Sequence, residues 1–174
     1  AMRNGKVDKK TKILDPRKMK IGWWEIKNYD YDRNRNPGLI DLAYLFEHSS
    51  NVASAKVSQM MTPQEFYDTL KTFNFGEATG IDLPGESSGI LPPPKSWDVA
   101  THGAMGYGYG ASVTAIQMAS AVAAIANNGV WITPHVIKYS PEELEQKIIK
   151  RRVMSEQTAH DLTWILVKAL ENGK

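Results

Sequence analysis

Apolar residues recur at helical spacing in four stretches of the chain, with polar residues between them. Residues at this spacing share one face of a helix, so each stretch predicts an amphipathic helix with one buried side. The apolar sets are Leu42, Leu45 and Phe46; Val52, Ala55 and Met60; Phe66, Leu70 and Phe73; and Ala159, Leu162, Leu166 and Ala169. We expect the last helix to run from Ser155 to Leu170, with Gly173 as its C-cap.

Three stretches carry the polar signature of a helix start. In each, a threonine or serine is followed three residues later by glutamate or glutamine, which can close a capping box. The stretches are Thr62–Glu65, Thr114–Gln117 and Ser140–Glu143. Proline at positions 63 and 141 suits the first helical turn. Helices are therefore expected to begin just after Thr62, Thr114 and Ser140.

The segment from Ala115 to Ala126 differs from the amphipathic stretches because it is apolar on nearly every side. Such a helix needs neighbours all round, so we expect it to be the buried central helix of the core. It is shorter than the ~20 residues that a membrane span requires. Asn128-Gly129 marks its end.

The remaining apolar runs predict only short strands. Ile21–Ile26 reads as one strand, and Asn28–Gly38, rich in turn residues, as a loop. Val130–Ile132 and Val136–Ile137 flank a proline and predict a small hairpin. Residues 76–100, dense in glycine and proline, predict loop and short strand. The expected fold class is mainly α with short strands.

The stretch His48-Ser49-Ser50-Asn51 lies at the break between the first two predicted helices. We expect the hydroxyl of Ser49 and the amide of Asn51 to point the same way. A hydroxyl can relay a proton, and a carboxamide can donate to and accept from a peptide-like substrate. The pattern S-x-N alone is short, and a serine that caps the second helix is the alternative reading.

Composition fits one globular domain and narrows the classes of function. The chain has 174 residues, 42% hydrophobic and 23% charged, with a net charge of +2 and no cysteine. Residues 1–20 carry eight lysines and arginines against two aspartates. This run lacks interleaved aromatic residues, so it indicates a solvated surface rather than a nucleic-acid-binding arm. No apolar run approaches a membrane span, and no signal peptide is visible.

Other residues that can carry chemistry favour plainer roles. The four histidines have no ligand-like spacing and no cysteine partners, so we expect no metal site. Gly106–Gly110 lacks the Lys-Ser/Thr ending of a phosphate-binding loop, so nucleotide binding is not expected; close backbone packing beside a substrate groove is the role that the family resemblance described next implies. Glu86 has no second acid to share catalysis with, so bracing a loop is favoured. No organic cofactor is implied.

Several separated blocks give Ser49-x-Asn51 a context. They are Gly76–Glu86, Gly106–Gly110, Thr114–Ala119, and Ala126–Gly129 with Pro134. In this order the set resembles the transpeptidase domain of class B penicillin-binding proteins, over nearly the whole chain. The resemblance implies the helical half of a transpeptidase/β-lactamase-like α/β domain. We expect residues 1–174 to form a single partial domain whose sheet strands lie mostly outside the chain.

Two motifs of that family are missing from the chain. No serine here is followed three residues later by lysine, and no Lys-Thr-Gly or Lys-Ser-Gly occurs. In the family the S-x-x-K motif would precede residue 1, and the K-T/S-G motif would follow residue 174. We therefore expect this chain alone to be inactive. Its parent is expected to be membrane-anchored and extracytoplasmic, with the anchor outside the chain.

The resemblance implies that the parent is a D,D-transpeptidase that cross-links peptidoglycan stem peptides through an acyl-serine, is acylated by β-lactams, and works with proteins of cell division or elongation. Carried over by motif, Ser49 shuttles a proton to the leaving amine, and Asn51 binds the substrate's backbone amide. The alternative is a non-catalytic module of the same fold that binds peptidoglycan or a partner. A domain without its sheet should expose apolar surface, so self-association of the fragment is also expected.

Overall fold

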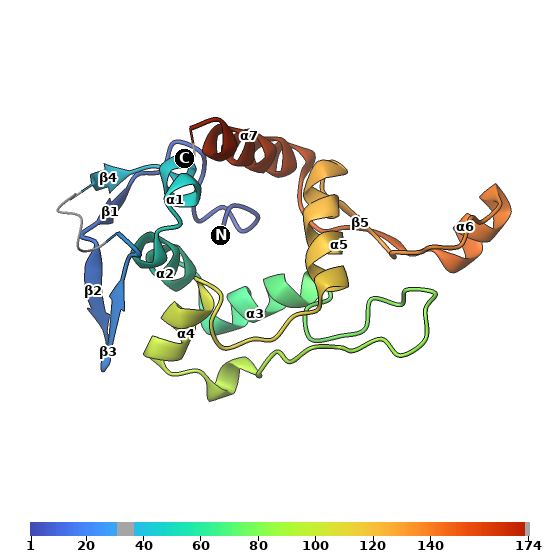
Figure 1. Cartoon of the computed structure of the whole chain (residues 1–174), viewed down its shortest axis with the longest axis horizontal. Coiled ribbons are helices and arrows are strands. Elements are labelled where there is room, and N and C mark those ends of the chain that lie inside the picture. The colour runs from blue at the N-terminus through green and yellow to red at the C-terminus, as the bar shows by residue number, and fades with distance from the viewer. Residues whose placement is uncertain (31–36, 173–174) are drawn as a thin grey trace.

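Six of the seven α-helices in the described part of the chain form an open ring around its first residues, and α6 lies outside the ring (Figure 1). The structure is a computed structural model that describes residues 1–30 and 37–172, so the loop expected at 28–38 lies partly outside the described residues, and the C-cap at Gly173 wholly outside. The helices are α1 (Leu42–Glu47), α2 (Asn51–Gln59), α3 (Pro63–Thr72), α4 (Val99–Met105), α5 (Ala115–Ala126), α6 (Pro141–Lys147) and α7 (Glu156–Asn172). A short 3₁₀ helix, Pro94–Ser96, precedes α4.

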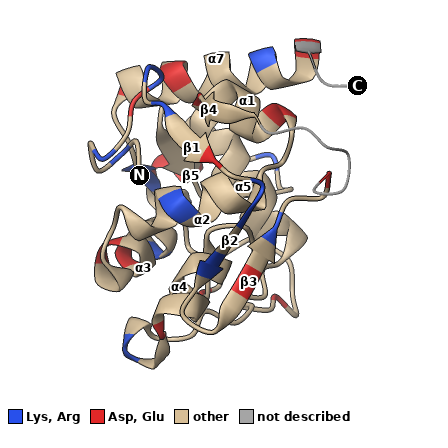
Figure 2. Cartoon of the chain, turned by 90° about the vertical axis from the view of Figure 1, so that its left-hand side faces the viewer, with Lys and Arg blue, Asp and Glu red and all other residues tan. Residues whose placement is uncertain are grey.

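The described strands pair into three separate antiparallel ladders of two strands each. The strands are β1 (Ile13–Asp15), β2 (Lys18–Ile21), β3 (Trp24–Lys27), β4 (Gly38–Ile40), β5 (Val130–Ile132) and β6 (Lys150–Arg152). β1 pairs with β4, β2 with β3, and β5 with β6. Figure 2 shows the first two ladders beside α1 and α2, whereas β5, α6 and β6 form an arm on the opposite side of the ring. The mainly helical fold class is confirmed.

The three predicted capping boxes are all present and fix where their helices begin. In each, the cap oxygen accepts from the backbone of the third helical residue, whose side chain accepts from the cap backbone. The helix predicted over residues 115–126 has the expected bounds. These features depend on neighbours three residues apart, which is why the sequence predicts them well.

Two strand predictions are wrong. Residues 21–26 are not one strand: Gly22, at φ +56°, turns the chain so that Ile21 pairs with Trp24. The hairpin partner of Val130–Ile132 is β6 rather than Val136–Ile137. The carboxylate of Asp82 accepts from the backbone amides of residues 136 and 137, so these amides are bound by a side chain instead of a ladder.

Helices account for the other two differences. α4 was not predicted, and its first two residues fall in the segment predicted as loop and short strand; its N-cap is Asp98, whose carboxylate accepts from the amide of Thr101 at 2.7 Å. α5 is not buried all round. Its neighbours α7 and β5 cover only one side, so Met118 and Val122 are 48% and 52% exposed. The prediction of a fully buried central helix is therefore wrong for this chain.

Packing holds α2 on two sides. One core cluster joins Ala53 of α2 to α1, β1, β4 and Ile165 of α7. A second packs Val52 and Ala55 of α2 against the β2–β3 hairpin. A third lies across the ring, between α5, β5 and α7. Because residues of α2 belong to two core clusters, the start of this helix is packed against both of them.

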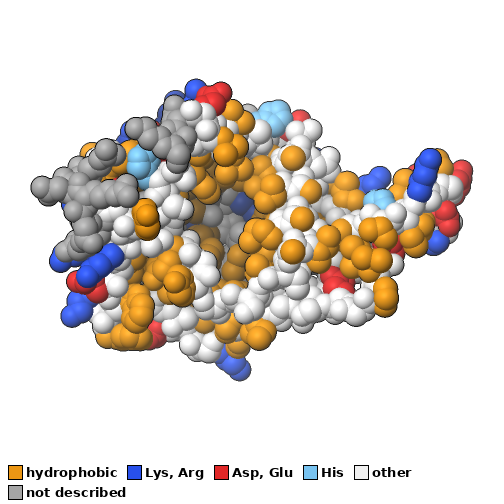
Figure 3. Space-filling view, in the orientation of Figure 1, with side chains coloured by type: hydrophobic (Ala, Val, Ile, Leu, Met, Phe, Trp, Pro, Cys, Tyr) orange, Lys and Arg blue, Asp and Glu red, His pale blue; other side chains and the backbone are white. Residues whose placement is uncertain are grey.

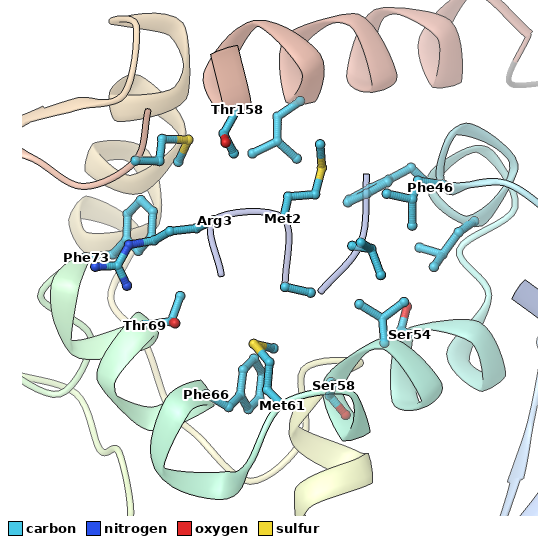
Figure 4. A pocket seen from close by; sticks show the side chains of 18 residues that line it. Met2, Arg3, Phe46, Ser54, Ser58, Met61, Phe66, Thr69, Phe73 and Thr158 are labelled. Carbon is cyan, nitrogen blue, oxygen red and sulfur yellow. The ribbon is translucent and has the colours of Figure 1, made fainter. Parts of the chain in front are cut away.

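A mostly apolar cavity of about 270 Å³ lies inside the ring. The space-filling view shows the surface hollowed there, with hydrophobic side chains around the opening (Figure 3). In the close-up, Met2 and Arg3 of the N-terminal segment lie in the middle of the cavity, with Phe46, Phe66 and Phe73 around it (Figure 4). Among the described helices, none is long and apolar enough to cross a membrane.

Candidate active-site motif

The S-x-N motif lies at a sharp break between α1 and α2. α1 ends at His48, Ser49 turns the chain in the left-handed region at φ +50°, and Ser50 is the N-cap of α2. The amide of Ser50 donates to the carbonyl of Leu45 at 3.0 Å, which closes the end of α1. Few residues other than glycine adopt such a conformation, so surrounding contacts must hold Ser49 in it.

The sequence allowed two roles for a serine here, a catalytic hydroxyl or a helix cap, and the two serines differ in which role they fit. The cap is Ser50, whose Oγ accepts from the amide of Ala53 at 3.0 Å and whose side chain is buried. Ser49 is exposed, so its hydroxyl is open to solvent. Asn51, the first residue of α2, donates from Nδ2 to the carbonyl of Lys27 at 3.0 Å. The motif therefore has an exposed hydroxyl, on Ser49, just before the buried cap residue Ser50, and a hydrogen-bonded carboxamide, on Asn51, just after it.

A buried polar cluster supports this corner. Asp15, at the end of β1, is 1% exposed, and Asn28, just after β3, is 7% exposed. Ser50 donates to Oδ2 of Asp15 at 2.6 Å, and Asn28 donates to both oxygens of the same carboxylate. Asp15 and Asn28 were not among the residues singled out in the sequence. No local pattern marks them, since they lie 35 and 22 residues before Ser50.

The Gly106–Gly110 segment packs closely against α2. A Cβ atom at Gly106 would lie 2.6 Å from Oγ of Ser58 and 2.7 Å from the carbonyl oxygen of Ser54, so only glycine fits there. Tyr107 accepts from the indole of Trp24 at 3.2 Å and packs on the cluster that holds α2. Close backbone packing is thus confirmed as the role of this glycine.

Together, these contacts describe a motif at the start of α2 that is held by the ends of β1 and β3. A family model described as "Penicillin binding protein transpeptidase domain" matches residues 1–174. The chain belongs to this family. The transpeptidase-domain family was expected from the sequence, and the match confirms it over the whole chain.

Named relatives and solved structures agree with the family. PbpB of Mycobacterium tuberculosis is 39% identical over 127 residues, which cover 70% of this chain and 19% of that protein. FtsI of Escherichia coli, named a peptidoglycan D,D-transpeptidase, is 28% identical over 66% of this chain and 20% of its own length. The transpeptidase domain of Burkholderia pseudomallei penicillin-binding protein 3 superposes with a TM-score of 0.85 at 25% identity, covering 96% of this chain and 48% of that one.

The transpeptidase-domain chain spans about a fifth of the length of these two named relatives. A crystal structure of penicillin-binding protein 3 from Mycobacterium tuberculosis, complexed with aztreonam, superposes with a TM-score of 0.81 at 29% identity. It covers 95% of this chain and 37% of that one. The likeness includes a helical fold with short strands, so the helical part of a transpeptidase domain is the architecture of this chain.

Residues outside the S-x-N corner have structural roles in the transpeptidase-domain chain. Glu86 braces its loop, because Oε1 accepts from the amide and hydroxyl of Thr79 and Oε2 from the amide of Gly80. Burial raises its pKa, but these hydrogen bonds outweigh burial and lower it overall. His48 stacks on Tyr44 at 3.9 Å between ring centroids. Within the described ranges, no group of three His, Cys, Asp or Glu side chains could hold a metal ion.

Proposed function

We propose that this chain is the central, helical part of a peptidoglycan D,D-transpeptidase. The observation that carries the proposal is an exposed Ser49 beside an anchored Asn51, at a break between helices, in a chain of the transpeptidase family. In the reaction, a nucleophilic serine attacks the D-Ala-D-Ala carbonyl of a stem peptide and releases D-alanine. The amine of a second stem then takes the acyl group and frees the serine.

Ser49 and Asn51 have different parts in this reaction. The exposed hydroxyl of Ser49 passes a proton, with a lysine from outside the chain, to the departing amine. The carboxamide of Asn51 binds the backbone amide of the substrate and helps to orient that lysine. One Nδ2 proton of Asn51 is engaged with the carbonyl of Lys27. This hydrogen bond fixes the orientation of the Asn51 carboxamide. The carboxamide oxygen and the second Nδ2 proton then remain for ligands.

The nucleophile and the K-T/S-G strand belong to segments outside residues 1–174. No serine here has a lysine three residues later. We propose that the segment bearing S-x-x-K borders the apolar cavity. The support for this is that Phe46 and Ser54, on either side of the motif, both line the cavity.

The setting of the proposed enzyme follows from its substrate. Stem peptides lie outside the cytoplasmic membrane, so the domain acts there, anchored by a segment outside this chain. β-Lactams are expected ligands of the complete domain, since the similar penicillin-binding protein 3 of Mycobacterium tuberculosis has been crystallised in complex with aztreonam and with ampicillin. Proteins of cell-wall synthesis, in division or elongation, are its expected partners.

Acylation of the complete protein tests this function. The protein that carries residues 1–174 with both flanking segments is incubated with benzylpenicillin, and its intact mass is measured. We expect the addition of one penicillin per chain, mapped by peptide mass to a serine of an S-x-x-K motif outside residues 1–174. A complete protein that takes up no penicillin, yet binds peptidoglycan in a pull-down, would be a non-catalytic binding module instead.

A further inference from the structure

The carboxylate of Asp15 is the centre of the buried cluster behind the S-x-N motif. It receives four hydrogen bonds: from the amide of Arg17 at 2.8 Å, from Nδ2 of Asn28 at 3.0 and 2.8 Å, and from Oγ of Ser50 at 2.6 Å. A buried carboxylate is costly unless it is hydrogen-bonded. Because both of its oxygens are engaged, Asp15 can stay buried only while Asn28 and Ser50 keep their places.

Asn28 and Ser50 also form hydrogen bonds with backbone amides at the start of α2. Oδ1 of Asn28 accepts from the amide of Val52 at 3.0 Å, and Oγ of Ser50 accepts from the amide of Ala53 at 3.0 Å. Two of the amides that a helix leaves unpaired at its start are therefore satisfied by this cluster. The negative charge of Asp15 lies one hydroxyl away, where the positive end of the helix dipole stabilises it.

The number of hydrogen-bond donors on each side chain of the cluster fixes the orientation of that side chain. A serine hydroxyl has one proton, and Ser50 gives it to Asp15, so its oxygen faces the amide of Ala53. The Nδ2 group of Asn28 faces Asp15, so its oxygen faces Val52. Losing Asp15 would remove the reason for both orientations. The cluster thus acts as one unit with a single arrangement.

Ser49 and Asn51 adjoin this unit directly. Ser49 has φ +50° and is next to the buried, hydrogen-bonded Ser50. Asn51 donates to the carbonyl of Lys27, the residue before Asn28, so consecutive residues of one strand end hold Asn51 and Val52. Among the described contacts, the Ser49 hydroxyl has no hydrogen-bond partner of its own. The position of the Ser49 side chain therefore depends on its backbone, which is joined to the buried Ser50.

We propose that Asp15, Asn28 and Ser50 are positioning residues of the transpeptidase, and that the middle residue of S-x-N orients the two on either side. The proposal rests on the proposed function. It makes Ser50 more than a helix cap: the Ser50–Asp15 hydrogen bond determines where the Ser49 hydroxyl stands when the acyl-serine forms. Displacing a reacting group by about 1 Å can cost on the order of 10²-fold in rate.

The test compares two buried serines of one helix in the complete protein. Ser50→Ala removes a member of the cluster, and Ser58→Ala is the matched control. Ser58 is 2% exposed and bonds to the carbonyls of Ala55 and His102, outside the cluster. For each variant, stopped-flow kinetics with a fluorescent penicillin separates the non-covalent Kd from the acylation rate constant. Thermal melting is measured alongside.

We expect Ser50→Ala to lower the acylation rate constant by about 10–100-fold with little change in Kd, while Ser58→Ala stays within about twofold. Asp15→Asn should lower the rate similarly, and the double variant should lose no more than Asp15→Asn alone, because the residues act as one unit. Equal rates in Ser50→Ala and Ser58→Ala, with both melting lower, would overturn the proposal and leave a structural cap. If Asp15→Asn does not fold, Ser50→Ala still decides.

A second readout separates this proposal from the proposed function. If the wild-type protein is not acylated, the proposed function fails, and amide hydrogen exchange then decides whether the cluster orders the motif. Ser50→Ala and Asp15→Asn should each speed exchange at Val52 and Ala53 about tenfold or more over Ser58→Ala. Unchanged exchange at both amides would overturn the positioning role as well.

Discussion

Oγ of Ser50 lies 2.6 Å from Oδ2 of Asp15, although the two residues are 35 positions apart, and both are 1% exposed. This hydrogen bond ties the end of β1 to the start of α2. The exposed Ser49 is adjacent to it in the chain. A surface motif with a proposed catalytic role is therefore next to a hydrogen bond between two buried residues, which fixes the backbone that carries the motif.

The chain alone should not react with penicillin. Acylation needs an activated serine, and no serine in residues 1–174 has the lysine partner of the family. Intact-mass spectrometry after incubation with a fluorescent penicillin should show unmodified protein. A stable stoichiometric adduct would contradict this, and its location on Ser49 would mean that the roles are misassigned.

The chain alone should self-associate. The cavity is lined mostly by apolar side chains, and the outer face of α5 exposes Met118 and Val122. Burying such surface contributes about 25 cal/mol per Å², which favours association. Light scattering behind a sizing column should show species heavier than 19.4 kDa. Met118→Lys should shift them toward monomer, and Gln146→Lys on exposed α6 should not. A clean monomer that binds no hydrophobic dye would contradict the prediction.

Stability should fall as pH drops below neutrality, because of His102. Burial against Phe66 and Trp97 lowers the pKa of His102 below its usual value of about 6.5. Below that value the unfolded chain binds a proton that the folded chain does not, so acid favours unfolding. The melting temperature should decline from pH 7.5 to 5.5, and less steeply in His102→Leu. The exposed-histidine control, His160→Gln, should keep the wild-type slope; an unchanged slope in His102→Leu would refute this account.

Asp82 should lock the arm to the Gly76–Glu86 segment. Its carboxylate accepts from the amides of Val136 and Ile137, each at 2.9 Å, and from the hydroxyl of Tyr139 at 3.1 Å. The hydrogen bond from Val136 is the largest cause that lowers its pKa. The stabilisation is therefore present above the usual carboxyl pKa of about 3.9 and is lost as pH falls through the lower folded value.

Amide hydrogen exchange measures how strongly Asp82 holds the amides of Val136 and Ile137. In Asp82→Asn, the amides of Val136 and Ile137 should exchange at least about tenfold faster, because hydrogen bonds to a charged acceptor are among the stronger ones. Asp68→Asn, at an exposed acid on α3, is the control and should leave both amides unchanged. Equal exchange in the two variants would show that the arm is held by other contacts.

Local signals in the sequence predict much of this fold. Thr114 and Gln117 are three residues apart, and their capping box sets the start of α5 without help from distant residues. The pairing of Val130 with Arg152 could not be predicted in this way. Its alternative, Val136, is nearer in the chain, but the amide of Val136 donates to the distant Asp82 instead of to a strand.

In the candidate site, too, residues with a local signal in the sequence could be predicted, and residues that act through long-range contacts could not. Ser49 and Asn51 could be singled out because a three-residue motif and its neighbouring blocks carry a family resemblance. Asp15 and Asn28 could not, since their role arises only when β1 and β3 fold against α2. Polar residues at strand ends are usually solvated, and nothing local marks these two as buried.

The acylation rates of Ser49→Ala and Asn51→Ala in the complete protein test the central claim most directly. Each variant removes one polar group at the reacting centre, and such losses typically cost ~10²–10⁴ in rate. Both should be acylated slower than wild type by that order, with melting temperatures close to wild type. Ser87→Ala, on an exposed loop, should react normally. Wild-type acylation rates in both motif variants would contradict the assignment of this chain as the part of a transpeptidase that carries S-x-N.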